Sequence, residues 1–150
     1  STMTYNEYFL VLDEGLTPDD LVNFKYEEEG VASLEDGMYV LEKNLNDAAF
    51  KDKMVRFVRA SMKGWKYAEA NPKEAAMIIL DNDDAGVQTE KHQVRMMGEI
   101  AKLTAGSNGS LDPADYERTV KVLMSGDSDP VITKKPSGAW TNEITNAALN

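Results

Sequence analysis

The residues near the start of the chain that could do chemistry are Thr4, Tyr5, Asn6, Glu7 and Tyr8. A carboxylate accepts hydrogen bonds from amino groups, an amide both donates and accepts, and a tyrosine ring stacks on flat ligands. Such groups suit a small polar heteroaromatic ligand. The same residues also suit an ordinary helix start, with Asn6 as the N-cap and Glu7 near the positive end of the helix dipole. Residue types alone leave both interpretations open.

No catalytic or metal-binding set stands out elsewhere. The chain has no cysteine, which excludes disulfides, thiol catalysis and cysteine-based metal sites. His92 is the only histidine, and a lone histidine beside Lys91, Gln93 and Arg95 is typical of a surface or helix-packing position. The acidic run at residues 81–84 lacks the spacing of an EF-hand calcium loop. We therefore expect a binding protein that is not an enzyme and that uses no metal or cofactor.

Composition limits the class of partner. The 150 residues are 42% hydrophobic, which is typical of a folded chain, and carry a formal net charge of −10. Such an acidic surface repels nucleic-acid phosphates and anionic lipids, so neither is an expected partner. An apolar run begins almost at once, at residues 8–12. This start predicts a segment of a longer protein, with a native start after methionine removal as the alternative.

The elements that must position these residues mix helix and strand in the first third of the chain. A short helix is expected over residues 7–14, with Gly15 as its left-handed stop. Alternation of Val22, Phe24 and Tyr26 with polar residues predicts a half-buried strand. Residues 37–41 indicate a second strand.

The rest of the chain, from Phe50 onward, is predicted to be helical. From Phe50, an apolar stripe with a 3.6-residue period predicts one long helix, and Asn71, Pro72 and Glu74 mark a sharp break and a new start. Further helices are expected from about Thr89, after Asp112 and from residue 141 to residue 149. We expect Phe57, Trp65 and Ile78 to be largely buried because they lie on the apolar stripes of the connected pair.

The amino-acid sequences of several segments are more specific than the spacing of their apolar residues. In order, they read TYNE, EEG, LEDGMYVL, RASMKGWKYAEANPKEAA, TEKHQVRMM, LDPADYERTV and DPVITKKPSGAWTNEITNAAL. Together they cover nearly the whole chain. They resemble the C-terminal half of ABC-transporter periplasmic substrate-binding proteins of the thiamine-pyrimidine-precursor, nitrate, sulfonate and taurine class.

The resemblance implies an α/β fold, namely the helix-rich C-terminal portion of a two-lobed, hinged type II periplasmic-binding-protein fold. Residues 1–30 would complete one lobe, residues 31–45 would cross the hinge as a strand, and residues 46–150 would form the helical part of the other lobe. The partners it implies are a small-molecule ligand, the membrane permease of an ABC importer, and the missing N-terminal half or a second copy of the chain. It also implies a periplasmic or lipid-anchored extracellular location.

The resemblance gives the first motif a role. Glu7 would anchor the amino group of a thiamine pyrimidine precursor, with Tyr5 and Asn6 beside it in an interlobe cleft. The alternatives are a sulfonate, taurine or nitrate binder, or an enzyme of the same fold that makes the pyrimidine. That enzyme class relies on histidine and cysteine, and nothing in this sequence supports it. An unrelated helical interaction domain is a third possibility.

Overall fold

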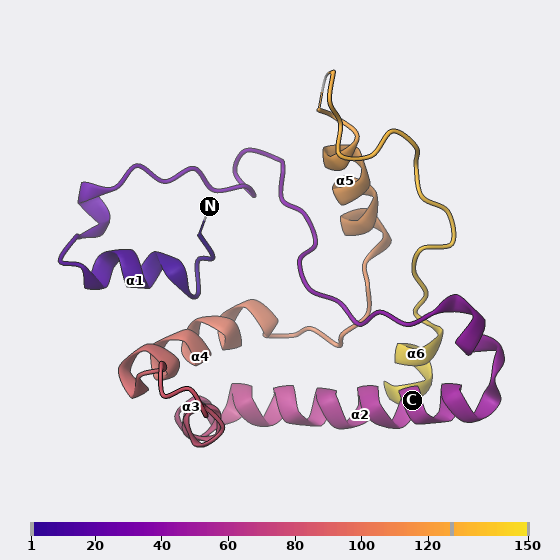
Figure 1. Ribbon diagram of the computed structural model, residues 1–150, viewed down its shortest axis with the longest axis horizontal. Coiled ribbons are helices and arrows are strands. Elements are labelled where there is room, and N and C mark those ends of the chain that lie inside the picture. The colour runs from indigo at the N-terminus through magenta and orange to yellow at the C-terminus, as the bar shows by residue number, and fades with distance from the viewer. Residues whose placement is uncertain (1, 127, 150) are drawn as a thin grey trace. The chain divides into compact units, whose positions relative to one another are not determined.

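The computed structural model describes residues 2–126 and 128–149 and builds them from helices joined by long open segments (Figure 1). The elements in chain order are α1 (Glu7–Asp13), η1 (Pro18–Asp20), η2 (Glu42–Asn46), α2 (Ala48–Ala70), α3 (Pro72–Asp81), α4 (Glu90–Thr104), α5 (Pro113–Leu123) and α6 (Glu143–Leu149), where η denotes a 3-10 helix.

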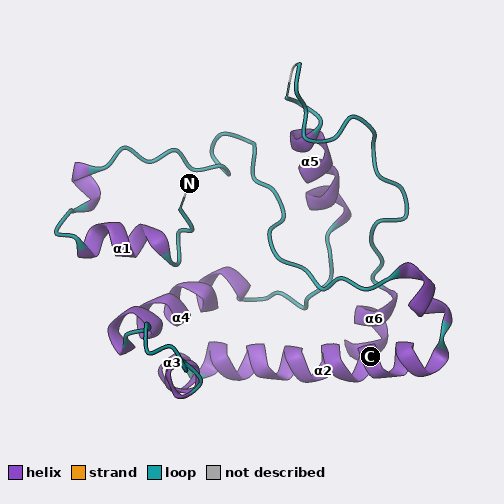
Figure 2. Cartoon of the chain, in the orientation of Figure 1, coloured by secondary structure: helices purple, strands orange, loops and turns teal. Residues whose placement is uncertain are grey.

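The expected α/β fold is wrong for the residues that the structure describes, because none of them lies in a β-strand (Figure 2). The strands expected at residues 22–26 and 37–41 are open chain, apart from a turn that begins at Tyr26. The expected hinge strand over residues 31–45 is likewise open chain as far as residue 41 and then enters η2. Alternating apolar residues predict a strand only where a neighbouring strand takes up the backbone hydrogen bonds and covers one face. Neither condition is met here, and the side chains of Val22, Phe24 and Tyr26 are exposed.

The helix starts agree better with the sequence. Asp112 caps α5 by accepting from the amide of Ala114 at 2.7 Å, and Thr89 caps α4 by accepting from the amide of His92 at 3.3 Å. The break before α3 also lies where Pro72 predicts it. The Asn71 side chain, however, donates to the carbonyl oxygen of Tyr67 instead of capping α3.

The chain divides into two units, each made of segments that are distant in sequence. The first contains residues 2–22 and 60–108 and is centred on the packing of α3 against α4 (Figure 1). Its buried centre consists of Ala75, Ala76 and Met97. The small alanine side chains of α3 let the two helix backbones approach closely, and Met97 fills the space that remains.

The second unit contains residues 23–59, 109–126 and 128–149. It buries Val120 and Ala148 and also contains several side-chain hydrogen bonds to backbone groups. The Asn142 side chain exchanges two hydrogen bonds with the backbone of Leu111, at 3.0 and 2.9 Å. The Arg59 guanidinium donates to the carbonyl oxygens of Ala147 and Ala148 in α6. The two hydrogen bonds from Arg59 satisfy carbonyls that the last turn of α6 leaves without partners.

The predicted burial of three large side chains is wrong. Phe57, Trp65 and Ile78 are 56%, 44% and 51% exposed. Their stripes are amphipathic, as expected, but α2 lacks an apolar partner helix that covers its stripe along its length among the described residues. Periodicity identifies which face of a helix is apolar, whereas burial also requires a second surface.

The central role of the α3–α4 contact leads to a first prediction. Ala76 is 0% exposed, so Ala76→Leu must push the two helices apart. We expect the substitution to lower the free energy of unfolding by about 1–3 kcal/mol in urea titrations. The matched control is Ala60→Leu on the exposed surface of α2, which should leave stability nearly unchanged. Equal effects of the two substitutions would show that the α3–α4 contact is not the packing centre.

Candidate ligand-binding site

The three residues singled out in the sequence lie at the beginning of α1, in the first unit. Tyr5, Asn6 and Glu7 are all half-buried. Asn6 occupies the N-cap position but makes no side-chain capping bond. Its side-chain oxygen Oδ1 instead lies 2.8 Å from Nε2 of His92 on α4. The structure thus brings the first motif together with the one histidine of the chain.

This contact orients the His92 ring. An amide oxygen only accepts, so Nε2 of His92 donates the hydrogen in this contact. His92 is only 7% exposed, and its Nδ1 makes no hydrogen bond to any described residue. The bond fixes the Asn6 amide so that its Nδ2 group remains available as a donor, since that group makes no hydrogen bond to another described residue.

Glu7 is held in a defined position at the same helix start. Its Oε2 accepts from the backbone amide of Met3 at 2.9 Å. This hydrogen bond lowers the pKa of Glu7, so the carboxylate is ionised at neutral pH. The second oxygen, Oε1, makes no hydrogen bond to the other described residues and is available as an acceptor. Asn6 and Glu7 therefore offer one donor and one acceptor at adjacent positions.

Further contacts along α1, in addition to that of Asn6, attach this helix to α4. Asp13 forms ion pairs with Arg95 and with Lys91, the latter at 2.9 Å. The Arg95 guanidinium also lies over the ring of Phe9, 4.7 Å from its centroid. No residue of α1 is buried, so the helix depends on these contacts for its position. The contact with Arg95, followed by that with Lys91, holds the pKa of Asp13 well below its usual range.

The sequence did not indicate that α4 contributes to this site. Of the two expected positions of His92, surface or helix packing, the structure shows the second, since His92 and Gln93 are buried, at 7% and 4% exposed. The i, i+4 spacing of Lys91 and Arg95 was the available signal, because it places two cations on one face of the helix. The sequence gives no indication that Asp13 is the residue facing them.

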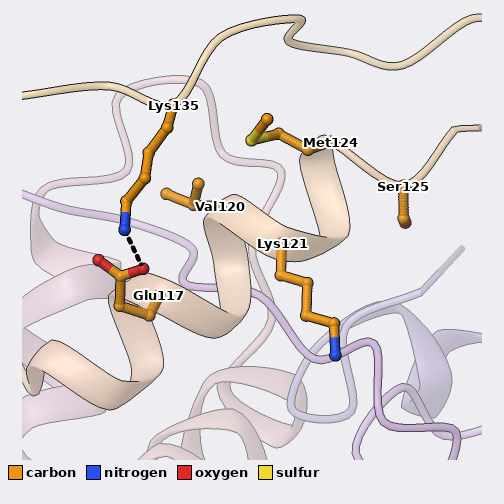
Figure 3. A pocket seen from close by; sticks show the side chains of 6 residues that line it. All are labelled: Glu117, Val120, Lys121, Met124, Ser125 and Lys135. Atoms are coloured by element: carbon orange, nitrogen blue, oxygen red, sulfur yellow. Dashed lines mark hydrogen bonds and ion pairs between the residues drawn. The ribbon is translucent and has the colours of Figure 1, made fainter.

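A hollow of about 420 Å³ lies on α5 in the other unit. Figure 3 shows Val120 and Met124 at its apolar wall and Lys135 reaching Glu117, with which it forms an ion pair of 2.6 Å. Lys121 points away from Lys135 in this view. Because one cation is neutralised and the other diverges from it, the hollow is a poor site for an anion.

Within residues 2–126 and 128–149, no three histidine, cysteine or carboxylate side chains gather as a metal site would require. No helix in this part of the chain has the length and apolar character needed to cross a membrane. Comparisons with family models, with curated proteins and with solved structures find no match to this chain. The functional assignment therefore depends on the residues themselves.

The attachment of α1 leads to a second prediction, on pH. The folded-state pKa of Asp13 lies below its unfolded value, so its ion pairs stabilise the docked helix above about pH 4 and lose this effect as pH falls toward the lowered pKa. Asp13→Asn should raise the hydrogen-exchange rates of the α1 amides at pH 7. The difference from wild type should shrink in strong acid, where Asp13 of the wild type is also protonated.

The matched control for this experiment is Asp19→Asn, which makes the same chemical change at an exposed residue that forms no ion pair with another described residue. It should leave exchange in α1 unchanged at both pH values. Equal exchange in Asp13→Asn and wild type at pH 7 would show that the ion pairs do not hold α1.

Proposed function

We propose that this chain forms part of the solute-binding component of an ABC importer and helps to capture a small ring ligand that carries an amino group. The best candidate is a thiamine pyrimidine precursor. The observation that carries the proposal is the ionised Glu7 carboxylate, held by Met3, next to an Asn6 amide oriented by His92. The protein would bind the ligand outside the cytoplasm and deliver it to a membrane permease without chemical change.

The hydrogen-bonding groups favour this ligand class. The free oxygen of Glu7 accepts from an exocyclic amino group, while Nδ2 of Asn6 donates to a ring nitrogen beside it. An aminopyrimidine presents both groups on one edge. Tyr5, which precedes them in the chain, offers an aromatic face for stacking. Recognition of one donor and one acceptor by two fixed side chains is typical of small-molecule sites.

The same groups disfavour the alternative ligands. A sulfonate or a nitrate presents only anionic oxygens, which an ionised Glu7 repels. The hollow on α5 does not compensate, because Lys135 is paired with Glu117. The order and wording of the sequence blocks support the transport assignment independently, since they resemble this class of binding protein over nearly the whole chain.

The test is calorimetric titration of the intact protein with an aminopyrimidine and, separately, with taurine. Glu7→Gln removes the ionised acceptor while keeping the shape of the side chain. Hydrogen bonds to charged groups contribute about 1.5–3 kcal/mol, so affinity for the aminopyrimidine should fall about ten- to a hundredfold. The matched control, Glu14→Gln, makes the same change at the other end of α1 and should bind as wild type does.

Two results would contradict the assignment. One is unchanged pyrimidine affinity in Glu7→Gln. The other is tight binding of taurine by the wild type with none for the pyrimidine. Either result would leave Glu7 as a residue that only stabilises the helix start.

A further inference from the structure

The hydrogen bond between His92 and Asn6 fixes the orientation of one amide from a different helix. Nε2 of His92 lies 2.8 Å from Oδ1 of Asn6. The His92 ring is only 7% exposed and belongs to α4, whose packing on α3 forms the centre of the first unit. Asn6 makes no side-chain capping bond with α1. The direction in which the Asn6 amide faces is therefore set by α4 and not by α1.

The neighbouring carboxylate of Glu7 by itself favours cations. Its pKa is lowered, chiefly by the hydrogen bond from the Met3 amide, so the group is charged at neutral pH. A carboxylate attracts amidines and guanidines strongly, because these cations present two N–H donors together with a positive charge. An uncharged aminopyrimidine presents one N–H donor and one bare ring nitrogen. The charge of Glu7 therefore does not account for a preference for the uncharged ring.

The fixed amide of Asn6 supplies the missing discrimination. With Oδ1 held by His92, the group left for a ligand is Nδ2, which only donates. A bare ring nitrogen accepts from Nδ2, whereas the second N–H of an amidine would place a donor against a donor. An amide that could turn over would present Oδ1 to that N–H and would bind both kinds of ligand. Leaving a polar group without a partner is an effective way to reject the wrong ligand.

We propose that His92 is a positioning residue that sets the ligand selectivity of this site. By fixing the Asn6 amide, it admits uncharged rings with one donor and one acceptor and rejects cations with two donors, such as amidines and guanidines. This inference rests on the proposed function, since it concerns the same Asn6 and Glu7 side chains. His92 acts through Asn6 and does not itself contact the ligand.

The experiment is calorimetric titration of the intact protein with 4-aminopyrimidine and, separately, with benzamidine. The readout is the ratio of the two Kd values, because a merely structural role of His92 would weaken both ligands alike. The wild type should bind 4-aminopyrimidine more tightly. His92→Leu removes the donor and lets the Asn6 amide turn over, so this preference should fall about tenfold. His92→Gln places an amide N–H near the position of Nε2 and should retain the preference.

A second variant tests the same selectivity without altering the buried ring. Asn6→Asp keeps the shape of the side chain and still accepts from His92, but it replaces the Nδ2 donor by an acceptor oxygen. It should reverse the preference toward benzamidine. The matched control is Asn23→Asp, which makes the same change in charge at an exposed residue of the second unit and should keep the wild-type preference.

The inference is overturned if the wild type binds benzamidine as tightly as 4-aminopyrimidine, or if His92→Leu and His92→Gln give equal ratios. Either result leaves the proposed function in place as long as 4-aminopyrimidine binds and Glu7→Gln weakens that binding. If the wild type does not bind 4-aminopyrimidine at all, the proposed function and this inference are both overturned.

Discussion

The close approach of α3 and α4 is the contact on which the first unit depends. Ala75 and Ala76 bring the two backbones together, and Met97 closes the remaining space. Large side chains would have given more buried apolar area, but they would have separated the helices. The arrangement fixes the orientation of α4, and with it the face that carries His92 and Arg95. The ion pairs of Asp13 and the hydrogen bond between Asn6 and His92 begin from that face.

The attachment of α1 is polar because α4 offers α1 a polar face. Asp13 meets Arg95 and Lys91, Phe9 lies under the Arg95 guanidinium, and Asn6 meets His92. Ion pairs at partly exposed positions contribute little individually, so a helix held in this way is positioned without being locked. That property suits a ligand-binding element, since the side chains that would read the ligand are oriented while the helix keeps some freedom.

The second unit differs in that some of its backbone N–H and C=O groups make no hydrogen bond to another described residue. Its contacts include side-chain hydrogen bonds to isolated carbonyls and amides, such as those of Arg59 to α6 and of Arg118 to Ala32, beside the buried Val120 and Ala148. Residues 36–40 make no hydrogen bond to any other described residue, and the side chains of Met38, Tyr39 and Val40 are exposed.

The sequence by itself determined the local features of this protein. Pro72 and Asp112 marked helix starts because their effects involve only neighbouring residues, and Gly15 was recognisable as a left-handed stop. The tertiary structure alone decided what these elements touch. Alternation at Val22, Phe24 and Tyr26 could not reveal that no strand lies beside them, nor could the stripe through Trp65 reveal that it stays half in solvent. The hydrogen bond between Asn6 and His92 joins residues far apart in the chain, and a local sequence pattern cannot predict a contact of that kind.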